Sequence, residues 1–143
     1  MTLEEEIEQR KKAEETLRES EERLRLIFEY APDGYYMLDQ EGRFIDGNKV
    51  SEQITGYRKE QLVGKTFFQA GLLSLDQISK AALMFEKYCQ GLPCGPEELV
   101  LTRQDGSKVT VEINTYPIKV DNKIHLLGIA RDNPEALRAI FRA

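Results

Sequence analysis

Residues 2–28 form a charged segment that carries a thin apolar seam. They contain no glycine or proline and are rich in Glu, Lys, Arg, Leu and Ala, the residues that lose least entropy in a helix. Acidic residues repeatedly precede basic ones by four positions, as in Glu14 with Arg18 and Glu21 with Arg25. Each such pair stabilises an exposed helix by about 0.3 kcal/mol. The pattern predicts one long, solvent-exposed helix of about 40 Å, at a rise of about 1.5 Å per residue.

The apolar seam of this helix advances by four and three residues. Such spacing is typical of a parallel coiled coil between two copies of a chain, although polar and small residues weaken this seam. The alternative is a charged, solvated helix that folds back on its own domain. In both cases the helix is a connector. The seam consists of Ala13, Leu17, Ser20, Leu24 and Ile27, preceded less regularly by Leu3 and Ile7.

Beyond Pro32, which biases the preceding residue away from helix, the pattern changes to short apolar runs. Residues 34–38 and 43–48 flank a turn and predict an antiparallel hairpin. Three helical stretches follow: 48–56 with Asn48 as N-cap and Gly56 as stop, 58–64, and a longer helix over 74–91 capped by Ser74. The inner face of the longer helix is predicted to carry Ile78, Ala81, Ala82 and Phe85.

Three strands are predicted at 97–104, 107–120 and 123–132. They are joined by Asp105-Gly106 and Asp121-Asn122, both strong turn dipeptides. Strict alternation gives the middle strand one apolar face, made by Val109, Val111 and Ile113. The order of elements predicts an α+β fold: a five-stranded antiparallel sheet with short helices on one face, preceded by a long N-terminal helix.

We therefore divide the chain into a helix over 1–28, a domain over 29–132, and the start of a second helix over 133–143. In the last segment Asn133 is the expected N-cap, Pro134 the first helical residue, and Leu137, Ile140 and Phe141 an apolar stripe.

Composition narrows the function. The chain has 143 residues, 41% of them hydrophobic and 31% charged, with a net charge of −5, so it suits one core and does not favour nucleic acid as a partner. It has no apolar run long enough for a membrane span and no signal peptide, so we expect a cytoplasmic protein. The spacing of Cys89 and Cys94 favours two ordinary thiols, with a redox or metal role as the alternative.

The separated segments APDGYYMLDQEGRFIDGN, ITGYRKEQLVGK, LTRQDGSKVTVEI, YPI and GIARD resemble, in this order, a PAS domain over about residues 28–132. The segment TLRESEERLRLIFE resembles the signalling helix that commonly precedes such domains. The resemblance implies a sheet curled around the short helices, with a cavity between its inner face and the longer helix.

On the family pattern, the inward positions include Leu38, Gly47, Leu99, Ile113, Leu126 and Gly128. The polar inward residues Tyr36, Ser51 and Thr55 either orient a ligand or hydrogen-bond within the core. Taken together, the candidate ligand-binding residues are Tyr36, Ser51, Thr55, Phe67, Leu101, Val111 and Ala130.

Departures from the family argue against its known cofactors. Flavin-binding members carry a reactive cysteine after the GK motif, where this chain reads TFFQAGLL; coumaryl-binding members need a cysteine near Ser74; haem-binding members offer a histidine from the longer helix. This chain has no cysteine or histidine at any of these three positions, so the cofactor is left unknown. No metal site is predicted.

His125, Leu127 and Ile129 alternate with the inward set and are expected on the outer face of the sheet. The patch needs cover from the N-terminal helix or a second subunit, and His125 is an interface residue or, alternatively, a pH switch or metal ligand. The predicted dimer interface is Ala13, Leu17, Leu24, Ile27, Leu127 and Ile129.

These patterns lead to two hypotheses about function. The first is a sensory and dimerisation module of a two-component type of signalling protein, in which flanking helices relay the state of a ligand or interface to an effector such as a histidine kinase or cyclase. The alternative is a ligand-free scaffold for protein interactions. An enzyme is not expected, because the inward set has neither a nucleophile-base pair nor clustered carboxylates.

Overall fold

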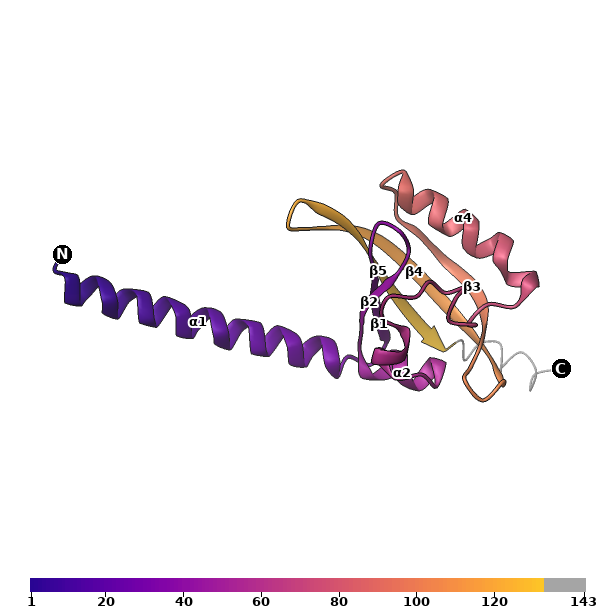
Figure 1. Ribbon diagram of the computed structural model, residues 1–143, viewed down its shortest axis with the longest axis horizontal. Coiled ribbons are helices and arrows are strands. Elements are labelled where there is room, and N and C mark those ends of the chain that lie inside the picture. The colour runs from indigo at the N-terminus through magenta and orange to yellow at the C-terminus, as the bar shows by residue number, and fades with distance from the viewer. Residues whose placement is uncertain (133–143) are drawn as a thin grey trace.

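A computed structural model describes residues 1–132, and the helix predicted over 133–143 lies outside these described residues. Helix α1 (Leu3–Glu29) begins with a capping box, in which the Glu5 N–H donates to Thr2 Oγ1 and the Thr2 N–H donates to Glu5 Oε2, both at 3.2 Å. The helix projects from the domain as a separate rod (Figure 1) and none of its residues is buried. The alternative of a helix folded back on its own domain is therefore wrong. The apolar seam of α1 is too narrow to hold the helix against a sheet.

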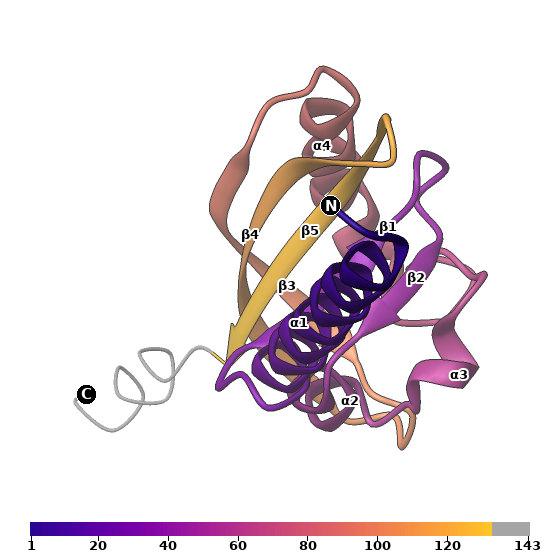
Figure 2. The same ribbon diagram turned by 90° about the vertical axis from the view of Figure 1, so that its left-hand side faces the viewer.

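The sheet has five antiparallel strands: β1 (Gly34–Leu38), β2 (Phe44–Gly47), β3 (Cys94–Thr102), β4 (Lys108–Val120) and β5 (Lys123–Asp132). Their order is β2-β1-β5-β4-β3, so the N-terminal hairpin lies beside the last strand of the chain. In this pairing Tyr36 stands opposite Gly128. Figure 2 looks towards α1 and shows β1 and β2 on one side of β5, with β4 on the other. The predicted α+β fold with a five-stranded antiparallel sheet is confirmed.

Turn chemistry places the hairpins where the sequence predicts them. Asp121 and Asn122 adopt positive φ values of 50° and 63°, as a two-residue hairpin turn requires, and Gly106 has a φ of 87°. The third strand begins at Cys94, earlier than predicted, because residues 94–96 continue along β4 beyond an irregularity in the register. The β4–β5 hairpin reaches beyond the rest of the sheet on the side from which α1 leaves (Figure 1).

Short helices cover the inner face of the sheet. Helix α2 (Lys49–Thr55) is capped by Asn48 and stops at Gly56, whose φ is 74°, as predicted. Helix α3 (Lys59–Leu62) follows. The longer helix differs from the prediction, because it starts with a 3-10 turn, η1 (Leu75–Gln77), before helix α4 (Ile78–Cys89).

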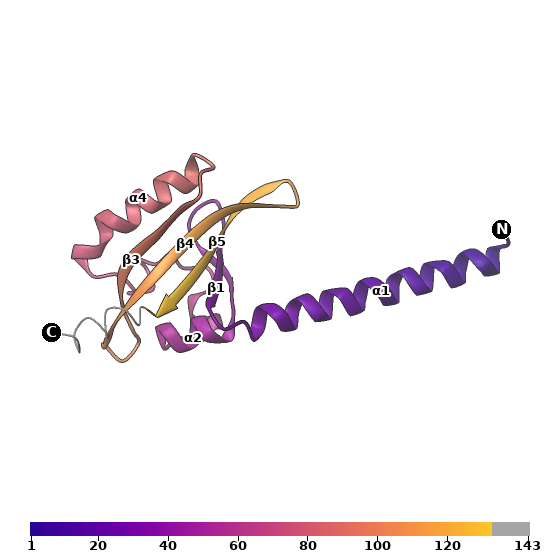
Figure 3. The same cartoon turned by 180° about the vertical axis from the view of Figure 1, so that it is seen from behind.

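The predicted inner face of α4 is confirmed in part. Ile78, Ala81, Ala82 and Phe85 all line the space between the helix and the sheet, although Ala82 is largely exposed. Met84 and Tyr88, which the prediction did not include, are the buried residues of the helix, because they continue the stripe of Ile78 and Ala81 at helical spacing. Helix α4 lies beside β3 and β4 (Figure 3).

Hydrogen bonds tether α4 to the sheet at both of its ends. Near its start the Val100 N–H of β3 donates to Gln77 Oε1 at 3.0 Å. Near its end the Tyr88 hydroxyl lies 3.1 Å from the Asp39 carbonyl oxygen and 3.0 Å from that of Ile124. The helix is therefore fixed at its ends, and between them it faces the sheet with apolar side chains.

The outer face of the sheet is only half covered. Leu127 and Ile129 are half-buried, as is His125, whose Nδ1 is enclosed without a hydrogen-bond partner among the described residues. The end of α1 meets this face at β1, where the rings of Phe28 and Tyr35 lie 6.0 Å apart. Within residues 1–132, every helix is too short or too polar to cross a membrane.

Candidate functional site

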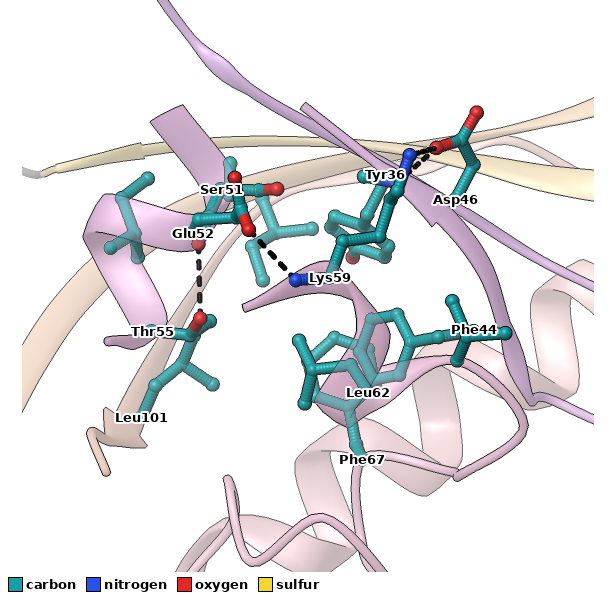
Figure 4. Close-up of a pocket in the computed structure, with 15 residues that line it drawn as sticks. Tyr36, Phe44, Asp46, Ser51, Glu52, Thr55, Lys59, Leu62, Phe67 and Leu101 are labelled. Atoms are coloured by element: carbon teal, nitrogen blue, oxygen red, sulfur yellow. Dashed lines mark hydrogen bonds and ion pairs between the residues drawn. The ribbon is translucent and has the colours of Figure 1, made fainter. Parts of the chain in front are cut away.

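A small interior cavity lies under β1 and β2 and beside α2 and α3 (Figure 4). The centre of a water molecule can occupy about 30 Å³ of this cavity. That is room for about one or two water molecules. Val111 is fully buried in the core and does not line this cavity. The other predicted ligand-binding residues all line it: Tyr36, Ser51, Thr55, Phe67, Leu101 and Ala130.

A larger groove separates α4 from the inner face of the sheet. The centre of a water molecule can occupy about 250 Å³ of this groove. The groove opens to solvent near the exposed residues Glu41 and Phe68. Its walls are mainly apolar, and they include Leu38, Phe67, Leu73, Ile78, Ala81, Met84, Phe85, Leu99 and Leu126. The sequence prediction did not include Leu73, Met84 or Thr115. Thr115 continues the alternation of Val111 and Ile113, so extending that period by one step would have found it.

Two aromatic rings, those of Tyr36 and Phe67, stand between the cavity and the groove, and the ring of Phe44 packs against both. The ring of Tyr36 meets the rings of Phe67 and Phe44 edge to face, with centroids 5.4 Å and 5.8 Å away. Both Tyr36 and Phe67 line the two spaces, so they form the partition between them. A methyl group added to Gly128 would lie 2.0 Å from Cζ of Tyr36. The glycine on β5 is therefore what allows the tyrosine ring to lie across that strand.

The polar residues of the cavity differ in how their hydroxyls are used. Ser51 Oγ donates to the Asn48 carbonyl at 2.7 Å, and Thr55 Oγ1 donates to the Ser51 carbonyl at 3.1 Å. Both hydroxyls therefore form hydrogen bonds with the backbone of α2 and its N-cap. The hydroxyl of Tyr36 has no hydrogen bond with any described residue, although the side chain is only 7% exposed. Burial raises the pKa of Tyr36 well above its ordinary value. This hydroxyl is the one polar group of the three left without a partner in residues 1–132.

Charged residues close the outer side of the cavity. Lys59 Nζ lies 3.3 Å from Asp46 Oδ1, and the Lys59 N–H donates to Glu52 Oε2 at 2.8 Å (Figure 4). The ion pair is partly exposed, so it contributes little to stability and can open at low cost. These side chains come from β2, α2 and α3, and they separate the cavity from solvent.

Asn48 is the residue whose role the sequence reasoning underestimated, because it was recognised only as an N-cap. Its side chain is completely buried. Oδ1 accepts from the N–H groups of Tyr35 at 2.8 Å and Ser51 at 3.1 Å, while Nδ2 donates to the carbonyls of Phe28 and Asp33, both at 2.9 Å. One amide thus joins the last turn of α1, the start of β1 and the start of α2.

A second link joins the same region to the end of β5. The guanidinium of Arg131 donates to both carboxylate oxygens of Asp33, each at 3.1 Å. Asp33 lies in the linker between α1 and β1, and Arg131 is next to the last described residue. The two ends of the described domain are therefore held together at one place.

Within residues 1–132, no three His, Cys, Asp or Glu side chains gather in a way that could hold a metal ion. Cys94 is a buried free thiol and Cys89 an exposed one.

Residues 32–135 match the sequence pattern of the PAS domain. The chain belongs to the PAS domain family. Members of this family are sensory modules, which agrees with the first of the two hypotheses at this general level. A comparison with curated proteins gave no match.

Solved structures of other PAS domains share the fold. A domain of a sensory box sensor histidine kinase/response regulator from Geobacter sulfurreducens is 28% identical, with a TM-score of 0.65, over 81% of this chain and 96% of that one. A PAS domain from Colwellia psychrerythraea is 27% identical, with a TM-score of 0.67, over 80% and 97%. The PAS domain of an HTR-like protein from Haloarcula marismortui has a TM-score of 0.67 at 24% identity, over 86% and 99%, and supports the fold alone.

Proposed function

We propose that this PAS domain is a sensory and dimerisation module of a cytosolic signal-transduction protein. In this proposal the occupancy of the groove or the state of the outer face changes the flanking helices, which pass the change to an effector such as a histidine kinase or cyclase. The division into a connector helix over 1–28, a sensor over 29–132 and a second connector over 133–143 is part of the proposal. The kinase-associated domain from Geobacter sulfurreducens is the relative that supports this setting.

The hydrogen bonds of Asn48 are the observation that carries the proposal. Asn48 directly precedes α2, and four residues of that helix line the cavity: Ser51, Glu52, Ile54 and Thr55. The same amide binds the Phe28 carbonyl in the last turn of α1. A shift of α2 therefore has a direct mechanical path to α1. A ligand can use this path only if its affinity differs between the two positions of the helix.

The dimer part of the proposal rests on apolar side chains that the described chain leaves uncovered. Leu17 is 59% exposed, Leu24 66% and Ile27 59%, and with Ala13 they follow the spacing of a coiled-coil seam. Leu127 and Ile129 add a half-covered patch on the outer face of the sheet. A second copy of the chain would cover both surfaces, with α1 pairing along its seam.

Disulfide crosslinking along α1 tests the dimer. In a Cys89→Ser, Cys94→Ser background, we expect Ala13→Cys, Leu17→Cys and Leu24→Cys each to give crosslinked dimers under mild oxidation. Glu15→Cys and Glu22→Cys are matched controls, because they lie on the opposite side of the helix and should crosslink poorly. A protein that stays monomeric in sedimentation at high concentration, with no seam-specific crosslinks, would refute the dimer.

The relay is tested by Asn48→Asp. The aspartate keeps the acceptor for Tyr35 and Ser51 but loses both donors, so the bond to the Phe28 carbonyl is removed. We expect faster amide exchange at Tyr30 and Ala31, which directly follow α1 and donate to carbonyls of its last turn, and an altered crosslinking efficiency at Leu24→Cys. Arg131→Gln is a milder second variant on the exposed surface, in case the buried carboxylate prevents folding. Unchanged exchange and crosslinking in both variants would argue against a mechanical link.

One observation favours the second candidate, a ligand-free scaffold. The centre of a water molecule can occupy only about 30 Å³ of the interior cavity. Side chains therefore already fill most of the space between these elements. Native mass spectrometry of protein purified from cells separates the two candidates. A retained small molecule supports sensing, and an empty core whose outer face still recruits a partner supports the scaffold.

A further inference from the structure

The partnerless hydroxyl of Tyr36 indicates what kind of molecule the groove is built to hold. The Tyr36 hydroxyl makes no hydrogen bond with a described residue, and its oxygen is not enclosed by protein atoms, so an occupant or a water molecule can reach it. A hydroxyl in an apolar region is costly if it stays without a hydrogen bond. Tyr36 is 7% exposed and lines both the cavity and the groove. An occupant of either space can therefore reach this side chain.

The surroundings keep the ring of Tyr36 in place. It lies across Gly128, where a methyl group would come within 2.0 Å of Cζ, and it is bordered by Phe44 and Phe67. Moving the ring out to solvent would break these contacts. The hydroxyl is thus a fixed polar point inside an apolar region, the arrangement that orients a bound ligand.

The groove also limits the charge of its ligand. Its lining, which lies wholly within residues 1–132, contains no Lys, Arg or His. The one acidic residue, Glu41, is exposed at the mouth and is paired with Arg43 at 3.2 Å. A charged ligand would lose its hydration without gaining a counter-ion, which is strongly unfavourable. The remaining wall is mainly apolar, and its two threonine hydroxyls already have protein partners: Thr66 Oγ1 accepts from the Gln69 N–H and Thr115 Oγ1 donates to the Cys94 carbonyl. The driving force for binding is therefore the burial of apolar surface.

We propose that the groove between α4 and the sheet binds a compact, uncharged, mainly apolar molecule with one hydrogen-bond acceptor, to which the Tyr36 hydroxyl donates. The free space of about 250 Å³ suits a molecule about the size of a substituted single ring. This inference rests on the proposed sensory function, because it names the class of ligand for the groove of that module. The competing explanation is that one water molecule in the interior cavity forms the hydrogen bond with the Tyr36 hydroxyl.

The test compares three probes of similar size on the whole chain: acetophenone, which has a neutral acceptor; ethylbenzene, which has none; and benzoate, which is charged. Binding is followed by ¹H–¹³C shifts of the Met84 methyl group in the groove, with the Leu127 methyls on the outer face as the negative reference. We expect acetophenone and ethylbenzene to shift Met84 and benzoate to leave it unchanged.

The decisive variant is Tyr36→Phe, with Tyr35→Phe as the matched control. Tyr35 is the neighbouring tyrosine, and it points to the other face of the sheet. Tyr36→Phe is expected to weaken acetophenone binding roughly fivefold, the loss of one neutral hydrogen bond, without weakening that of ethylbenzene. Tyr35→Phe should change neither affinity.

Several results would overturn the ligand class. These are benzoate binding more tightly than acetophenone, no shift of Met84 with any probe, or equal losses in the two variants. A loss of stability in Tyr36→Phe of the ligand-free protein, with no change in acetophenone affinity, would show that water is the partner. The crosslinking of α1 does not depend on these probes, so failure of the ligand class and failure of the proposed function give different results.

Discussion

Replacing Gly128 by alanine tests whether the ring of Tyr36 lies across β5 as the structure has it. The added methyl would lie 2.0 Å from Cζ and 2.4 Å from both Cε atoms of Tyr36, far inside van der Waals contact. The ring cannot simply step aside, because Phe67 and Phe44 border it at centroid distances of 5.4 Å and 5.8 Å. Overpacking of this kind lowers the free energy of unfolding by about 1–3 kcal/mol.

A double-mutant cycle separates this clash from other effects of the substitution. In a Tyr36→Ala background the ring is gone, so the same Gly128→Ala change should cost little. It should even stabilise by up to about 1 kcal/mol, because alanine restricts the unfolded chain more than glycine does. The two positions are in contact, so we expect a coupling energy of about 1–3 kcal/mol.

Urea unfolding followed by far-ultraviolet circular dichroism measures all four proteins of the cycle. The unfolding midpoint should fall for Gly128→Ala in the Tyr36 protein only, with an unchanged dependence on urea concentration. Equal losses in the two backgrounds would refute the reasoning, because the cost would then come from the β5 backbone and not from the ring.

Three further predictions concern the tether of α4, the buried phenol and a turn. Tyr88→Phe removes the hydroxyl that contacts the carbonyls of Asp39 and Ile124. We expect the free energy of unfolding in urea to fall by about 1 kcal/mol and amide exchange in α4 to become faster. Burial raises the pKa of Tyr36 above the ordinary 10.0, so the folded state favours the protonated phenol. The contribution of Tyr36 to stability should be constant below pH 10 and be lost as pH rises beyond it. Tyr36→Phe should reduce the alkaline fall in stability, whereas an equal fall in both proteins would contradict the assignment. Asn122 has a φ of 63°, so Asn122→Ala should cost about 1 kcal/mol in the same urea assay, with Asn122→Gly tolerated.

Much of the fold could be predicted from short stretches of sequence. The absence of glycine and proline before residue 29, the Asn48 cap, the Gly56 stop and the Asp121-Asn122 turn are local signals. Each depends on backbone preferences that act over a few residues. These signals set the elements and, through strand alternation, which residues of β4 face inward.

The candidate site could be predicted only in part. The resemblance to PAS domains placed Tyr36, Ser51 and Thr55 around one cavity between the sheet and the longer helix. In the structure all three line the small cavity beside α2 and α3, and of the three only Tyr36 also lines the groove against α4. Val111 lines neither space, and Met84 and Thr115 of the groove were not included. The functions of the hydroxyls were also not visible in the sequence. Ser51 and Thr55 bond within α2 while Tyr36 has no partner among the described residues, a difference that depends on distances between elements.

What the sequence determined by itself was the set of helices, strands and turns, because neighbouring residues along the chain decide these. The tertiary structure alone decided that β1 pairs with β5, that Gly128 receives the ring of Tyr36, and that the Asn48 amide binds a carbonyl of α1 twenty residues away. It also decided the sizes of the two spaces. A cavity is the small remainder left when side chains from distant segments pack, and a shift of one ring opens or fills it.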